Sequence, residues 1–380
     1  MKKMMWALSL VSFLGSQPLW AAESKAGGLE LSGNIDVVVG YQHDDSDANG
    51  TFVGGQLGQF RGFTAPSRDT FNFYIDQVEL DLNRTFGENL RIRADLDFGR
   101  FLSGSGRNTN SDLTTAGSNF EIEQAYVTVN VFGSELLFGR FNVPIGYYVV
   151  DRADNPTISF SNVFNYITPT NATGMKFYKA FGEHFDWHVY VVNRLDDCVF
   201  FGGACLTTGG TPASDSAIPS YGTRIGFNWG GEDTKSTVGL SYAGGPERGG
   251  QNAHLTHLID LDFAVKFTPK FFIAGEGFYR QDNVVVAGPP NDKAFGGFLL
   301  GDFALSDTWD LFLRAGYLRD QTGFYTANNQ NIYDFALGVG YKITDGAKMK
   351  AEYSPQIFDS RTGGPTSLSH GFALEFAYNF

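Results

Sequence analysis

The sequence is poor in cysteine, in basic residues and in long apolar runs. It holds two cysteines, and its 28 Lys and Arg face 41 Asp and Glu, for a formal net charge of −13. This acidic balance argues against nucleic acid as a partner. After the first 22 residues no window of about 18 residues is both apolar and uncharged, which excludes a helical membrane protein.

Aromatic residues and glycine, in contrast, are abundant. The 380 residues include 36 Phe, 17 Tyr and 47 Gly, at a mean hydropathy of only −0.17. A membrane β-barrel needs this combination, because aromatic side chains cover its outer face and polar side chains fill its lumen. The composition therefore favours an all-β transmembrane barrel.

The first 22 residues predict a signal peptide. Lys2 and Lys3 precede a short apolar run at 4–14, and small residues follow at Ala21 and Ala22. This arrangement is typical of export, and the run is too short to span a bilayer. We therefore expect residues 23–380 to form the mature barrel. In an exported protein, Cys198 and Cys205 are expected to form a disulfide.

Alternating polarity predicts the strands. In 369–380 every second residue is aromatic or Leu, and the chain ends on Phe380, which resembles the signal read when outer-membrane barrels are inserted. Together with 29–41, fourteen further segments alternate, at 71–83, 90–101, 121–131, 135–143, 172–180, 185–194, 221–229, 235–242, 255–267, 271–280, 294–305, 309–318, 332–342 and 347–353. Register is ambiguous at 71–75, where residues of both parities are apolar.

The connections alternate between short and long. Seven short turns and eight long loops suit about sixteen antiparallel strands with both termini in the periplasm and long loops outside. A soluble β-sandwich would need neither outward aromatic residues on nearly every strand nor this regular rhythm. We expect a location in the bacterial outer membrane, with its lipid and lipopolysaccharide as surroundings.

One stretch resembles a known family. The residues that carry the resemblance are Gly139-Arg140-Phe141-Asn142-Val143-Pro144-Ile145-Gly146-Tyr147, then Asp154-Asn155-Pro156, then Thr173-Gly174. They resemble the β-barrel porins called OmpL-like, in which a G-R/Q-F-N-x-P-x-G strand is followed by D-N-P and a strand beginning T-G. The resemblance implies an outer-membrane porin-like channel. It supplies no ligand and no functional residue beyond the motif.

Strand parity predicts many charged side chains inside the barrel. A sixteen-stranded barrel is too wide for side chains to fill, so charges lining it would act on ions in water. The alternative is that these charges only solvate the lumen and pair with each other. The predicted pore-lining residues are Asp36, Glu79, Asp81, Arg91, Arg93, Asp95, Asp97, Asp260, Asp262, Lys266, Glu276, Arg314 and Lys350. Acids at middle depths, Asp334 among them, predict a weak cation preference.

The loop at 144–171 is unusually apolar for a segment in water. It is the third external loop, the one that folds inward as a constriction in many general porins. We predict an inward-folded loop that brings Asp151, Arg152 and Asp154 to the narrowest point. Packing on a neighbouring subunit, or capping of the barrel wall, is the alternative.

A second acidic motif precedes the second strand. Asp45, Asp47 and Asn49, followed by Gly50, fit the first half of a calcium loop. Gln56 stands where a bidentate Glu is expected and no flanking helices are evident, so an acidic surface loop is the simpler interpretation.

No catalytic set emerges from the six histidines, and no G-x-S-x-G is present, so we expect no enzyme and no cofactor. The predicted function is passive diffusion of small hydrophilic solutes and ions. A homotrimer is expected from analogy with porins of this size. The alternative is a structural or adhesive surface barrel with a plugged lumen.

Overall fold

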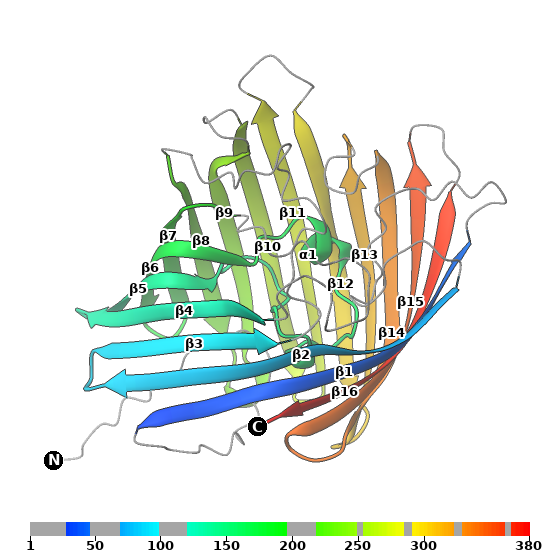
Figure 1. Ribbon diagram of the computed structural model, residues 1–380, viewed down its shortest axis with the longest axis horizontal. Coiled ribbons are helices and arrows are strands. Elements are labelled where there is room, and N and C mark those ends of the chain that lie inside the picture. Colours follow the sequence, from blue (N-terminus) through cyan, green and yellow to red (C-terminus); the bar gives the residue numbers. More distant parts are fainter. Residues whose placement is uncertain are drawn as a thin grey trace.

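The computed structural model describes residues 28–45, 69–98, 120–195, 218–248, 254–284, 291–322, 329–361 and 366–380. Sixteen antiparallel strands close into a barrel in which each strand pairs with its neighbours in sequence and β1 pairs with β16 (Figure 1). The strands are β1 (Leu29–Asp45), β2 (Asp69–Phe86), β3 (Leu90–Phe98), β4 (Phe120–Val131), β5 (Ser134–Asn142), β6 (Asn171–Phe181), β7 (Phe185–Val192), β8 (Ser220–Trp229), β9 (Ser236–Arg248), β10 (His254–Thr268), β11 (Phe271–Val284), β12 (Asp292–Ala304), β13 (Trp309–Asp320), β14 (Gln330–Lys342), β15 (Ala347–Ser360) and β16 (Ser367–Asn379).

The predicted barrel class and strand order are confirmed, and the main difference is in strand length. Several strands run further toward the long loops than alternation indicates; β15 continues past Tyr353 to Ser360. Pro355 has no amide hydrogen and so cannot donate a hydrogen bond within the sheet. On the β14 side the pairing skips from Gln356 to Tyr353, so Pro355 lies where no ladder bond is required.

The short turns lie together at one end of the barrel. Phe132 and Gly133 form a two-residue turn, with φ of 52° and 70°, the twist that a tight hairpin requires. Gly87 and Gly182 also follow a Phe and have positive φ. The two ends of the described chain lie at this same end, since Leu29 pairs with Arg84 and the Asn379 amide donates to Gly346.

The outer face is apolar and carries two aromatic bands. In β16 the alternation holds as expected, with Phe372, Leu374, Phe376 and Tyr378 all exposed. One band lies near the short turns and contains contacts such as Trp309–Tyr341 and Phe267–Phe271. The other lies near the long loops and contains contacts such as Tyr353–Phe372 and Tyr317–Tyr333. Two such bands are typical of the two interfaces of a membrane.

Among the irregularities in strand pairing, two β-bulges lie in β2 and β4, on either side of β3. In β2, Gln77 pairs with Asp36 and Ile75 pairs with Val37, so Asp76 is an extra residue. Phe71, Phe73 and Ile75 therefore face outward, and the parity changes after them, which explains the ambiguous register at 71–75.

The second bulge lies in β4. Gln124 pairs with Asp95 and Ile122 pairs with Leu96, which leaves Glu123 as the extra residue. A bulge turns one additional side chain to the same face. In both strands the additional side chain is a buried carboxylate, of Asp76 or Glu123.

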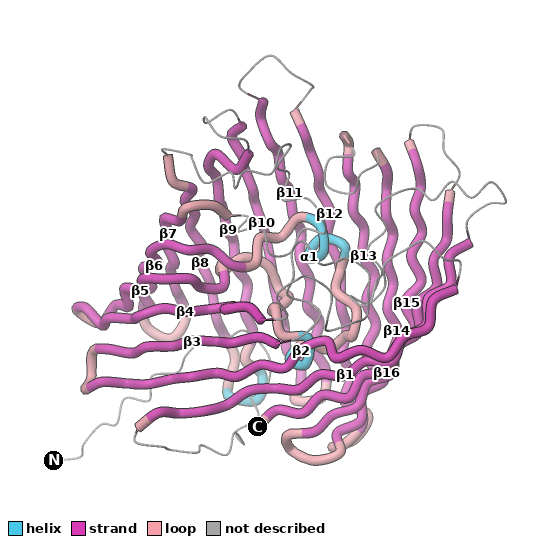
Figure 2. Tube along the Cα trace, viewed as in Figure 1, coloured by secondary structure: helices cyan, strands magenta, loops and turns pink. Residues whose placement is uncertain are grey.

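Helix is confined to short pieces in the part of the chain that the structure describes. These are η2 (Arg152–Asp154), α1 (Asn162–Tyr166) and η3 (Glu232–Thr234). No helix there is long and apolar enough to cross a membrane. Figure 2 shows the connection that carries η2 and α1 lying inside the ring of strands.

Candidate functional site

The inward loop, residues 143–170, connects β5 to β6 and crosses the lumen. Its partners include side chains on β13, β14 and β15. Because β13 is eight strands from β5 in a closed sixteen-stranded barrel, these contacts are on the opposite wall. Most of the loop's side chains are buried, including Phe160, Val163 and Phe164. The apolar composition of this segment is thus accommodated inside the barrel.

Aromatic side chains hold the loop in a compact form. Phe160 and Phe164 stack with ring centroids 4.5 Å apart. Tyr148 packs against both, and also against Phe298 of β12 at 5.1 Å. The hydroxyl of Tyr148 keeps a polar partner in Thr157 at 2.9 Å. Apolar packing therefore folds the loop on itself and fixes it to one wall.

Arg314 of β13 is the main polar attachment on that wall. Its Nη1 lies 2.8 Å from the Tyr148 hydroxyl and also donates to the carbonyl of Ser159, and its Nη2 lies 2.9 Å from Ser159 Oγ. Its Nε donates to Asp334 on β14 at 3.0 Å. A planar guanidinium can satisfy several acceptors in this way, and it holds the loop in one position.

Glu352 and Lys350 of β15 form hydrogen bonds with the loop backbone between residues 155 and 159. The Glu352 carboxylate accepts from the backbone amides of Ile158 at 2.6 Å and Ser159 at 3.2 Å. Lys350 Nζ donates to the carbonyl of Asn155 at 2.7 Å. Both strand residues are buried. The loop backbone thus receives hydrogen bonds that water would supply elsewhere.

The first turn of the loop is fixed by carboxylates of β10 and β11. The amide of Gly146 donates to Asp260 at 3.1 Å, and the amide of Tyr147 donates to Glu276 at 2.9 Å. Gly146 has a φ of 83° and a Cβ there would meet the Glu276 carboxylate, so this position suits glycine.

Three charged loop residues face β1, β2 and β16. Arg152 is fully buried and its Nε lies 3.2 Å from Asp76. Burial alone would lower the pKa of Arg152, but the acidic groups around it, Asp76 first among them with Tyr74, Asp36 and Glu375, together outweigh burial. The pKa is therefore raised and the group stays charged. Burial raises the pKa of Asp151 well above its usual range, and the carboxylates of Glu123 and Asp154 raise it further. Burial also raises the pKa of Asp154.

The structure places most of the predicted lumen charges in buried positions under the loop. Asp36, Glu79, Asp95, Asp97, Asp260, Asp262, Glu276, Arg314 and Lys350 are buried. Asp81, Arg91, Arg93 and Lys266 are half-buried and nearer the short turns. Arg93 lies between Asp95, at 2.7 Å, and Asp81, at 3.5 Å. Lys266 has no ion pair among the described residues.

Several residues of the site were not predicted. Asp76 and Glu123 were missed because each lies at a bulge, where the side of the strand that faces inward changes from odd to even positions or the reverse. The sequence signal for such a bulge is an alternating apolar pattern that shifts by one residue within the strand. Arg224 of β8 forms a bidentate salt bridge with Asp262, in which Nη2 lies 2.9 Å from Oδ1 and Nη1 donates to Oδ2. Glu375 pairs with Lys350. Each of these ion pairs joins two different strands. Predicting it requires the register between the strands, which the pattern within one strand does not give.

Three predictions lie outside the described residues. They are the signal peptide at 1–22, the disulfide between Cys198 and Cys205, and the calcium motif, of which Asp47 and Asn49 are not described and the side chain of Asp45 is not described.

The family described as "Putative beta-barrel porin-2, OmpL-like" matches residues 28–380. The chain belongs to this OmpL-like porin family. The resemblance drawn from residues 139–174 is thereby confirmed, and so is a location in the bacterial outer membrane. Membership relates the chain to porins, which are channels rather than enzymes. No curated protein sequence matches it.

Solved outer-membrane proteins share the fold. The outer membrane channel DcaP of Acinetobacter baumannii is 14% identical with a TM-score of 0.64, over 94% of this chain and 99% of that one. An anion-selective porin from Comamonas acidovorans is 12% identical with a TM-score of 0.60, over 93% and 99%. The trimer form of Vibrio cholerae OmpT is 11% identical with a TM-score of 0.53, over 93% and 99%.

Proposed function

We propose that this porin is a passive channel for small hydrophilic solutes and ions, with a weak preference for cations. The inward loop supports a filter at mid-depth, because it crosses from β5–β6 to β13–β15 and leaves charged groups on its surface. Solutes would cross the remaining hydrated space without a chemical step or a cofactor, sorted by size and by charge.

The charge of the interior is the observation that carries the cation preference. Among the described residues, the buried charged side chains are sixteen Asp or Glu and five Arg or Lys. Charges inside a low-dielectric wall are screened less than charges at a rim. Half-buried bases, such as Arg91, Arg93 and Lys266, oppose this field nearer the short turns, which supports a weak rather than a strong preference.

We place the short turns and both termini in the periplasm and the long loops outside, where the outer aromatic band would meet lipopolysaccharide. We also propose a homotrimer. The support is the shared fold with OmpT, for which a trimer form is solved.

Recording single channels in a planar bilayer tests the function. We expect discrete conductance steps, and in a KCl gradient a reversal potential with the sign of cation preference. The Comamonas porin of similar fold is anion-selective, so the sign is not set by the fold. Anion preference would contradict the proposal and would assign control to Arg93. A barrel that folds and inserts but does not conduct would instead be a plugged structural barrel.

A further inference from the structure

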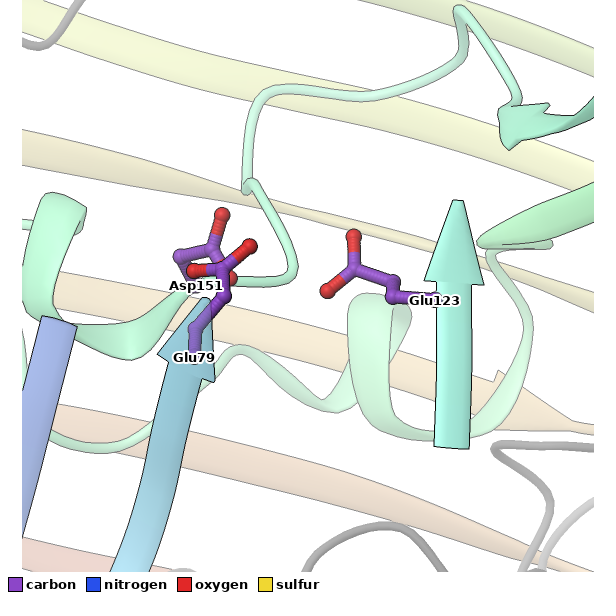
Figure 3. A group of neighbouring side chains, drawn as sticks. All are labelled: Glu79, Glu123 and Asp151. Atoms are coloured by element: carbon purple, nitrogen blue, oxygen red, sulfur yellow. The ribbon is translucent and has the colours of Figure 1, made fainter. Parts of the chain in front are cut away.

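Three carboxylates meet where the inward loop touches the wall of β2 and β4. They are Glu79 of β2, the bulge residue Glu123 of β4, and Asp151 of the loop (Figure 3). One oxygen from each lies within 4.8 Å of the other two. Glu79 and Glu123 are buried and Asp151 is half-buried. Such closely spaced like charges are unfavourable unless a proton or a cation joins them.

Among the described residues, these carboxylates have amide partners and no basic partner. Asn34 Nδ2 donates to Glu79, Asn142 Nδ2 donates to Glu123 Oε1 at 2.8 Å, and Gln77 Nε2 donates to Asp151 at 2.7 Å. Primary amides orient a carboxylate but do not neutralise it. The arrangement resembles the outer support of a metal site, in which ligand oxygens are held by hydrogen bonds from behind.

One buried carboxylate oxygen of this cluster has no hydrogen-bond donor among the described residues. Glu123 is 2% exposed, and its Oε2 accepts no hydrogen bond from the described residues. Figure 3 shows this carboxylate directed toward Asp151 and Glu79. An ionised oxygen buried in this way costs free energy unless something binds it. The bulge in β4 is the reason that Glu123 faces this point at all.

We propose that Glu79, Glu123 and Asp151 bind one Ca²⁺ ion, which ties the inward loop to the barrel wall. Ca²⁺ binds carboxylate oxygens at about 2.3–2.6 Å, so one ion can reach oxygens up to about 5 Å apart. Three carboxylates offer up to six oxygens, within the six to eight that Ca²⁺ takes. Mg²⁺ fits less well, because it requires shorter bonds and a regular octahedron.

Calorimetry on the refolded full-length protein tests this site directly. The protein is stripped with EDTA, freed of lipopolysaccharide and titrated in detergent with CaCl₂. We expect one saturable site, and Glu123→Gln and Asp151→Asn each to weaken it at least about tenfold, because ligand charge sets affinity. Glu135→Gln, the same change on β5 outside the cluster, should bind as the parent does. Heat-modifiable gel migration shows that each variant folds.

The external motif provides a second control. Asp47→Asn removes a ligand candidate of the first external loop and should leave the affinity unchanged. If Asp47→Asn abolishes binding while Glu123→Gln retains it, the ion belongs to the external loop and the proposal is wrong. If the parent binds no Ca²⁺, the three carboxylates share protons instead, and the proposal is also wrong. Neither result depends on conductance, so neither bears on the channel function.

Hydrogen exchange distinguishes Ca²⁺ that fixes the inward loop to the wall from Ca²⁺ that binds elsewhere in the protein. Amide hydrogen exchange in a peptide covering residues 144–170 should slow when Ca²⁺ is added to the EDTA-treated parent, and should be unchanged in Glu123→Gln. Equal slowing in both proteins would contradict the proposal.

Discussion

Lys350 and Glu375 lie directly opposite each other on β15 and β16, with Nζ 2.7 Å from Oε2 and both side chains fully buried. The same Nζ donates to the carbonyl of Asn155 in the inward loop. One ammonium therefore joins two wall strands and the loop. Because water does not reach this pair, its partners cannot be replaced by solvent when one is removed.

Replacing Lys350 should therefore destabilise the barrel far more than replacing Lys348, which is half-buried on the same strand. Lys350→Met leaves Glu375 buried without its paired ammonium, and we expect a loss of about 3–5 kcal/mol. Lys348→Met breaks a partly exposed pair with Asp310 and should cost about 0.2–1 kcal/mol. Urea unfolding in lipid vesicles, followed by tryptophan fluorescence, measures both. Equal losses would contradict this account.

Selectivity should depend on pH above the range of an ordinary aspartate. Burial raises the pKa of Asp151 and Asp154, so both become neutral as the pH falls through values at which a solvent-exposed Asp is still charged. The cation preference should then decline. Reversal potentials recorded in EDTA, so that no Ca²⁺ neutralises Asp151, measure this between neutral and mildly acidic pH. In Asp151→Asn/Asp154→Asn the preference should shift toward anions already at neutral pH and vary less with pH.

The same two groups make a stability prediction with a definite sign. A carboxyl whose pKa is higher in the folded state binds more protons there than in the unfolded chain, so its contribution to stability falls as pH rises through the raised pKa. In EDTA, Asp151→Asn should therefore reduce the loss of stability between mildly acidic and neutral pH. Urea midpoints at several pH values measure it, and a steeper loss in the variant would count against a raised pKa.

Shortening the inward loop between Val150 and Phe164 should widen the pore while the barrel still forms. Asn142 and Asn171 pair directly across β5 and β6, so a short connection can join them without opening a sheet edge. We expect conductance to rise at least about twofold, since the open cross-section grows. Asp151→Asn/Asp154→Asn is the matched control, which should change selectivity with little change in conductance.

If the shortened variant conducts as the parent does, the loop is not the constriction.

Cys198 and Cys205 should form a disulfide, with Gly202 and Gly203 between them allowing a small ring. By the chain-entropy model, a ring of this size restricts the unfolded chain by roughly 2–3 kcal/mol. Thiol labelling of the denatured, unreduced protein should find no free thiol, and labelling after reduction should find two. Two thiols before reduction would exclude the bond.

The barrel was predictable because its outer face obeys one local rule. Alternation in β16, from Phe372 to Tyr378, depends only on which side meets lipid. The interior obeys no such rule. Glu123 is buried because β4 carries one extra residue, and Arg314 meets Ser159 because a loop crosses the lumen. Partners 155 positions apart are set by the closed geometry, which a strand-by-strand pattern does not contain.

The pairing of β1 with β16 also affects how the protein folds. Gln42 and Ser369, which share a hydrogen bond across this pair, are 327 positions apart in sequence. All the remaining strand pairs join strands that are consecutive in the chain. Bringing together the ends of so long a stretch of chain costs more conformational entropy than any other strand pairing. No hydrogen bond or side-chain contact between the two strands offsets this cost until they meet. Joining of β1 to β16 should therefore limit the rate of folding, with fifteen neighbouring pairs formed before it.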